Sequence, residues 1–312
     1  MNDTLMLIIS MAACLAGGLI SKYFLEKAPK NNFYTFLFNG AASAVVVPVL
    51  LCMGGFGEAS AFTVLLGLAF GLTTALQAVT RMMALNVGTL SYTYVIITFS
   101  TVISALSGVM FFGESISLSQ IVGIVLMLFS FYFAVKTSEE EKKANLKWFI
   151  LSLISFAACG GIGIMHKVHQ STEHKGEINA FLIISFITMA LSCAICAVVM
   201  YLKGVARSPV SNKTSLEEDA CTAVKSPSRG FIIILIWTVL SCGICTALNN
   251  KFNLYLSGVI DSALFFPLVN GGNLILSTLG ALIIFKEKLS KTQWIGVAVG
   301  IVSVIFLCNP FG

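Results

Sequence analysis

Ten continuous apolar runs of close to 20 residues dominate this sequence. A helix needs about 20 apolar residues to cross the hydrocarbon of a bilayer, and 57% of the residues are hydrophobic while only 11% are charged. Strands of a membrane barrel would alternate apolar and polar residues, whereas these runs are unbroken. We therefore expect an all-α integral membrane protein with ten transmembrane helices, at 5–24, 33–53, 62–85, 90–112, 118–135, 148–165, 178–202, 231–250, 263–285 and 292–308.

The sequence also contains an internal repeat. The segment FFGESISLSQIVG at 111–123 returns as IFKEKLSKTQWIG at 284–296, a shift of 173 residues, and ISMAACLAGGLISK at 9–22 returns as ISFAACGGIGIMHK at 154–167, a shift of 145. The two shifts differ by 28 residues, which the polar segment 203–229 accounts for. The repeat predicts one five-helix unit at 1–136, a connector at 137–147, and a second unit at 148–312 that carries the insertion 203–229.

Each predicted unit crosses the membrane five times, an odd number. The second copy must therefore enter the membrane upside down relative to the first. Inverted repeats are a recurrent construction of secondary transporters, which place the substrate near mid-membrane where the repeats meet. We expect alternating access by rocking of one repeat against the other.

Lysine and arginine collect in the cytoplasmic loops of membrane proteins. Loops after the odd-numbered runs hold sixteen of the 19 basic residues, and the other three are Lys167, Lys175 and Lys251. The charge pattern thus predicts a multi-pass protein of the plasma membrane with both termini outside and 203–229 in the cytoplasm.

A turn containing glutamate precedes the fifth and the tenth run. Glu114 in FFGES and Glu287 in IFKEKLS are each followed six residues later by Gln-x-x-Gly. This pattern and the five-plus-five plan resemble the EamA-type transporters of the drug/metabolite transporter superfamily. The resemblance implies a ten-helix transporter, usually an exporter, of small metabolites such as amino acids. Many members are drawn with cytoplasmic termini, so the resemblance and the charge count leave the orientation open. Each carboxylate is expected near the N-terminus of the following helix.

The run 5–24 is also similar to the first helix of the small multidrug resistance exporters of the same superfamily. Those exporters bind protons and cationic drugs at a membrane-embedded glutamate, a position that falls here at Cys14 and, by the repeat, at Cys159. A thiol in apolar surroundings cannot replace a carboxylate in that exchange. The resemblance therefore does not extend to antiport of cationic drugs.

Polar side chains recur on one face of several predicted helices. Polar residues are costly in a membrane unless they face a cavity or a partner, and Pro267 with Gly271 and Gly272 predicts a broken helix that exposes backbone to a substrate. The predicted substrate-binding residues are Gln77, Tyr94, Thr98, Asn250, Asn270, Asn273, Lys22 and Lys167. The alternatives are hydrogen bonds between helices for the amides and hydroxyls, and snorkelling to the interface for the two lysines.

We expect a secondary transporter of a small polar or zwitterionic metabolite, with the bilayer, the substrate and a coupling proton as partners. We expect no enzyme activity, cofactor, metal site or nucleic-acid partner, because nucleophile elbow, Walker loop and metal-ligand patterns are missing from the sequence. The nine cysteines are interpreted as small apolar packing residues. The alternative function is a membrane scaffold that recruits a partner through 203–229.

Overall fold

The computed structural model describes residues 2–28, 32–87, 93, 96–97, 99–134, 146–202, 229–284 and 290–307. This part of the chain is helical and contains no strand. The first half forms α1 (Asp3–Lys27), α2 (Asn32–Gly54), α3 (Ala61–Val87), α5 (Thr101–Phe112) and α6 (Leu118–Ala134). The second half forms α7 (Leu146–Gln170), the short 3₁₀ helix η1 (Glu173–Gly176), α8 (Ile178–Leu202), α9 (Arg229–Ser257), α10 (Ser262–Ile284) and α11 (Lys291–Leu307).

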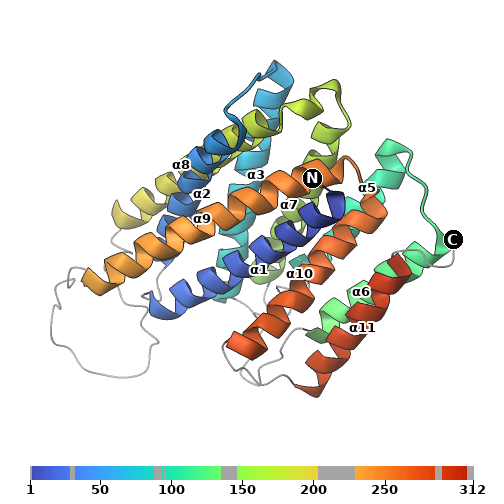
Figure 1. Ribbon diagram of the computed structural model, residues 1–312. Helices are drawn as coiled ribbons and strands as arrows, with labels where there is room; N and C mark the ends of the chain where they lie inside the picture. The colour runs from blue at the N-terminus through green and yellow to red at the C-terminus, as the bar shows by residue number, and fades with distance from the viewer. Residues whose placement is uncertain are drawn as a thin grey trace.

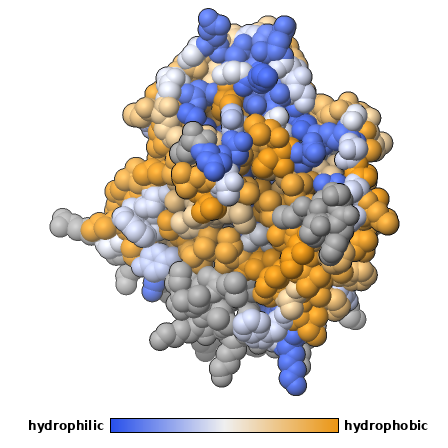
Figure 2. Space-filling model, turned by 45° about the vertical axis from the view of Figure 1, so that its right-hand side comes forward, coloured by the Kyte–Doolittle hydropathy of each residue, from blue (hydrophilic) through white to orange (hydrophobic). Residues whose placement is uncertain are grey.

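Within the described ranges, six helices are long and apolar enough to cross a membrane: α1, α2, α3, α7, α8 and α9. Large apolar side chains point outward from them, such as Leu65 on α3 and Ile233 on α9, with exposed fractions of 68% and 67%. Figure 2 shows a broad apolar band below a hydrophilic cap, at the height where Figure 1 places the α2–α3 turn and η1. These helices indicate a membrane protein.

The most extensive contacts join a helix of the first half to one of the second (Figure 1). α1 packs on α9, and α3 packs on α7. The other extensive pairs are α2 with α8, α6 with α11, α3 with α8, α2 with α9, and α5 with α10.

The Gln-x-x-Gly motifs have a local structural explanation in helix capping. The Ser117 hydroxyl accepts a hydrogen bond from the Gln120 N–H, and the Gln120 side chain accepts one from the Ser117 N–H. Ser290 and Gln293 form the same reciprocal pair at the start of α11. This arrangement is a capping box, which satisfies two backbone N–H groups at a helix N-terminus. The expected role of Glu114 at the start of α6 is therefore filled by Ser117 and Gln120.

Helix α10 is continuous, contrary to the break expected at its proline and glycines. Pro267 lies within the helix, in its second turn. Gly271 instead provides room for the Met127 side chain of α6, and Gly272 for Met11 of α1. These glycines serve close packing between helices, as small residues do in membrane bundles.

The ends of the bundle differ in the elements they carry. At one end α1 begins, α2 gives way to α3, and η1 joins α7 to α8; we call this the η1 end. At the opposite end α1 terminates and α9 begins (Figure 1).

Candidate functional site

A cavity of about 280 Å³ lies between α1, α2, α8 and α9. Its volume is just below the range of about 300–1,000 Å³ that is usual for small-molecule pockets. Ala13, Gly17, Gly18, Phe38, Phe186 and Met189 form much of its wall. The groups that can hydrogen-bond belong to Ser21, Asn39, Ser43, Thr246, Asn249 and Asn250, and three thiols come from Cys14, Cys242 and Cys245.

An apolar cluster closes the cavity toward the η1 end. Val46 and Leu50 of α2 pack there against Phe181 and Leu182 of α8 and Leu254 of α9, and each of these five side chains is buried. Such a cluster excludes water between the cavity and this end of the bundle.

A second apolar cluster lies on the other side of the cavity, toward the opposite end. Phe24 of α1 stacks on Phe38 of α2 with ring centroids 4.4 Å apart, and Val239 of α9 completes the cluster. The cavity therefore lies midway along the helices, between two apolar clusters.

Two of the cavity amides use their NH₂ groups within their own helices. Asn250 donates to the Thr246 carbonyl over 2.9 Å, and Asn39 donates to the Thr35 carbonyl over 2.7 Å. Each amide keeps its side-chain carbonyl oxygen and a second N–H for a ligand. These oxygens are hydrogen-bond acceptors for an amine, amide or hydroxyl group.

The neighbouring amides of α9 hold that helix to α1. Asn249 donates to the Ser10 carbonyl over 2.9 Å, and the Ser10 hydroxyl donates to the Asn253 side-chain oxygen over 2.7 Å. These bonds join two helices, which is the role expected of polar side chains that do not bind substrate. Asn249 therefore both borders the cavity and joins α9 to α1, while Asn250 bonds within α9.

The other predicted site residues are distributed over the bundle. Gln77 is half-buried on α3, where its backbone carbonyl accepts a 3.4 Å bond from Ser155. Asn270 of α10 donates to the Thr101 hydroxyl of α5 over 3.1 Å. Asn273 is half-buried, with its side-chain oxygen buried and without a partner among the described residues.

Lys167 is buried and forms an ion pair with Glu114. Of the predicted residues with described side chains, Asn250 alone lines the cavity between the two clusters. Tyr94 and Thr98 lie outside the described residues, as does the side chain of Lys22.

Sequence reasoning missed the contribution of α2. Asn39 and Ser43 line the cavity, and with Thr35 they form a polar series at spacings of four within the apolar run 33–53. That spacing puts all three on one helix face, the kind of polar face on which Gln77 and Asn250 were predicted.

Two glycines matched by the repeat have different surroundings. A Cβ atom on Gly18 of α1, beside the cavity, would meet no atom of the described residues within 4 Å. A Cβ on Gly163 of α7 would clash with the Ser104 side chain of α5 and approach Phe266 of α10 at 3.2 Å. One position is open and its counterpart is tightly packed.

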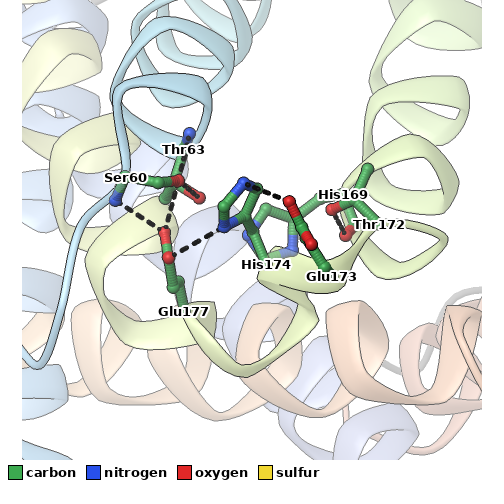
Figure 3. Close-up of polar contacts among 7 residues, drawn as sticks. All are labelled: Ser60, Thr63, His169, Thr172, Glu173, His174 and Glu177. Atoms are coloured by element: carbon green, nitrogen blue, oxygen red, sulfur yellow. Dashed lines mark hydrogen bonds and ion pairs between the residues drawn. The ribbon is translucent and has the colours of Figure 1, made fainter.

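The η1 end carries a polar network on Glu177 (Figure 3). The Glu177 carboxylate accepts hydrogen bonds from the Ser60 N–H at 2.9 Å and the Ser60 hydroxyl at 2.8 Å, and it lies 3.1 Å from the His174 ring. Hydrogen bonding by Thr63, and then by Ser60, lowers the Glu177 pKa from 4.5 to about 2. The network ties the segment before α8 to the start of α3.

A second cavity of about 590 Å³ opens beside this network. Glu58, Glu173, Glu177, Asn179 and Lys251 contribute its polar groups. Lys251 donates to the Met53 carbonyl over 3.2 Å, and Asn179 donates to the Gly55 carbonyl over 3.1 Å. The buried cluster around Leu50 and Phe181 separates this polar cavity from the one at Asn250.

The chain is similar in fold to a protein of known structure. No family model matches the chain. A protein of Haemophilus influenzae, itself uncharacterized, is 26% identical over 212 residues, which are 65% of this chain. The match spans 60% of the length of that relative. One solved crystal structure is similar with a TM-score of 0.69 over 97% of this chain and 95% of the other, at 14% identity, a likeness that concerns the fold alone.

Proposed function

We propose that this protein is a secondary transporter of a small polar or zwitterionic metabolite such as an amino acid, acting in the plasma membrane by alternating access. The observation that carries the proposal is the cavity at Asn39 and Asn250, which lies midway along apolar helices between two apolar clusters. A site of this kind can hold a small molecule away from both ends of the bundle. Transporter sites lie at such a depth, between the repeats.

The helix contacts support the two inverted repeats that this mechanism requires. The sequence repeat matches α1 to α7 and α3 to α9. The α1–α9 contact should therefore recur as a contact between α7 and α3, and both pairs of helices make extensive contacts. The contacts of α2 with α8, α5 with α10 and α6 with α11 each join a helix to its own counterpart. Such self-matching contacts are expected around a two-fold axis between copies.

The contrast between Gly18 and Gly163 supports alternation between two states. Related copies in identical surroundings would place both glycines in open space or both in packed contacts. Instead the α1 copy borders a cavity while the α7 copy is packed against α5 and α10. In alternating access the two repeats exchange such environments during each cycle.

The test compares metabolites inside and outside cells that overproduce the intact chain or its Asn39→Ala, Asn250→Ala variant at equal membrane levels. A metabolite whose distribution changes with the intact chain, and much less with the variant, identifies the cargo and the direction. Leu240→Ala is the matched control, because Leu240 is an exposed residue of α9 outside the cavity. An intact chain that moves no metabolite, or a double variant that moves it equally well, would contradict the proposal.

The scaffold alternative falls on residues 203–228, which lie outside the described residues. Deleting that segment tests it, since scaffolding would be lost while transport would continue.

A further inference from the structure

A buried ion pair connects the two halves of the chain at the η1 end. Glu114 lies in the turn between α5 and α6, and Lys167 lies in the last turn of α7. Both side chains are 9% exposed. The pair joins a carboxylate of the first half to an ammonium group of the second.

The same carboxylate also holds the start of α10. Its Oε2 atom accepts a hydrogen bond from the Ser262 N–H over 2.7 Å, at the N-terminus of α10, where negative charge is favourable. Gly108 of α5 makes room for this arrangement, because a Cβ atom there would occupy the position of Glu114 Oε2. One side chain thus fastens the α5–α6 turn to both α7 and α10.

Directly inside the ion pair, the same three helices are closely packed. Gly163 lies one turn before Lys167, against Ser104 of α5 and Phe266 of α10. The Ser104 hydroxyl donates to the Gly160 carbonyl of α7 over 3.3 Å. The ion pair therefore lies over a tight contact of α5, α7 and α10.

Buried ion pairs contribute little to net stability, because desolvation offsets the attraction between the charges. They do distinguish sharply between arrangements, since separating the partners leaves a buried charge uncompensated. The sequence repeats both members as Lys22 and Glu287, at the shifts of 145 and 173. The side chain of Lys22 and residue 287 lie outside the described residues.

We propose that Glu114, Lys167 and the Ser262 N–H form a gate that keeps the η1 end closed over α5, α7 and α10. Opening this end requires the Glu114 carboxylate to leave Lys167 and Ser262, which lets α5 move away from Gly163. The gate rests on the proposed transport function, because a closed end has meaning only if it opens in the cycle.

The test uses a variant in which the other eight cysteines are replaced by alanine, so that Cys159, two turns deeper on α7 than Lys167, is its one thiol. A membrane-impermeant thiol reagent is added from the η1 side of the membrane, and the rate of labelling is measured. Glu114→Gln and Lys167→Gln should each raise this rate about tenfold, which corresponds to a shift of about 1.4 kcal/mol toward the open state. The double variant should label no faster than either single one, since the two residues act through one contact.

Glu173→Gln is the control, because its carboxylate is at the same end with an 89% exposed side chain. Labelling at the original rate in folded Glu114→Gln and Lys167→Gln proteins would overturn the gate, as would equal acceleration by Glu173→Gln. A failure of both single variants to fold would also overturn it, since the pair would then be a requirement for folding. Labelling needs no substrate, so it separates the two proposals. If the intact chain transports its cargo while both variants label at the original rate, the gate alone is refuted. If the variants label faster while the intact chain transports nothing, the transporter alone is refuted.

Discussion

The Ser130 hydroxyl of α6 donates a 2.7 Å hydrogen bond to the backbone carbonyl of Gly296 on α11. The same bond recurs with the helices exchanged, from Ser303 of α11 to the Gly123 carbonyl of α6, again at 2.7 Å. The repeat matches Ser130 to Ser303 and Gly123 to Gly296. The α6–α11 contact is thus self-complementary in its hydrogen bonds.

Ser130→Ala and Ser303→Ala should therefore destabilise the protein by similar amounts. Each removes one hydrogen bond between helices, worth about 0.6 kcal/mol on average in a membrane protein. Unfolding of the purified protein in mixed micelles measures both changes. A large difference between the two would show that the halves do not share this contact equally.

Gly123→Ala should cost more than either serine change. Its new Cβ atom would lie 2.9 Å from the Leu307 backbone nitrogen and 2.8 Å from the Leu307 Cγ atom, so α6 and α11 must separate. Overpacking of this kind costs about 1–3 kcal/mol. The same unfolding measurement checks it, and a cost below that of Ser130→Ala would contradict the close approach.

Gly18→Ala and Gly163→Ala form a matched pair at repeat-related positions. Gly163→Ala should lower stability by about 1–3 kcal/mol, because the methyl group collides with Ser104. Gly18→Ala should be nearly neutral, because its methyl group enters open space. Thermal unfolding in detergent compares them, and equal effects would contradict the asymmetry between the two copies.

The acidic limb of the stability profile should depend on Glu177. A carboxyl group whose pKa is lowered on folding stabilises the native state fully above its ordinary pKa, and this stabilisation is lost as the pH falls through the folded pKa. For Glu177 that window extends from about pH 4.5 down to about pH 2. Glu177→Gln should be less stable at neutral pH, and its difference from the original protein should shrink across this window in pH-dependent unfolding. A difference that stays constant between the two pH values would rule out this linkage.

Asn39→Ala should weaken transport without unfolding the protein. The change removes one acceptor from the cavity and, at about 1 kcal/mol per hydrogen bond, should reduce flux at low substrate concentration about fivefold. Initial rates in proteoliposomes measure it for the cargo that the metabolite comparison identifies. Ser192→Ala is the control, since Ser192 bonds the Thr188 carbonyl of its own helix outside the cavity. Equal losses in both variants would point to a general defect rather than a ligand contact.

The positions of most helices could be predicted from the sequence, because unbroken apolar runs and helix length follow directly from the residues, but the run 90–112 corresponds to α5 only from Thr101. The run 178–202 corresponds to α8 at both ends, while 231–250 underestimates α9, which extends to Ser257 through Lys251 and Asn253. The polar residues that extend α9 are stabilised by contacts that no local sequence pattern reveals. One example is the hydrogen bond from Ser10 to Asn253, 243 positions apart.

The partners of Glu114 illustrate the same limit. Its position in a turn suggested the nearest helix N-terminus, but the carboxylate reaches Ser262 and Lys167, which are distant in the sequence. Both lysine alternatives, substrate binding and snorkelling, assumed a side chain without a fixed partner. Only the packing of α5, α7 and α10 brings a carboxylate to Lys167.

The pairing of helices across the two halves also bears on how the chain is made. During synthesis α6 is complete before α11, its partner, has been translated, and α1 must wait for α9. The first five apolar segments therefore reach the bilayer with their principal packing faces unmatched. A ribosome that stops before Lys291 therefore leaves Gly123 of α6 without its contact to Leu307 of α11.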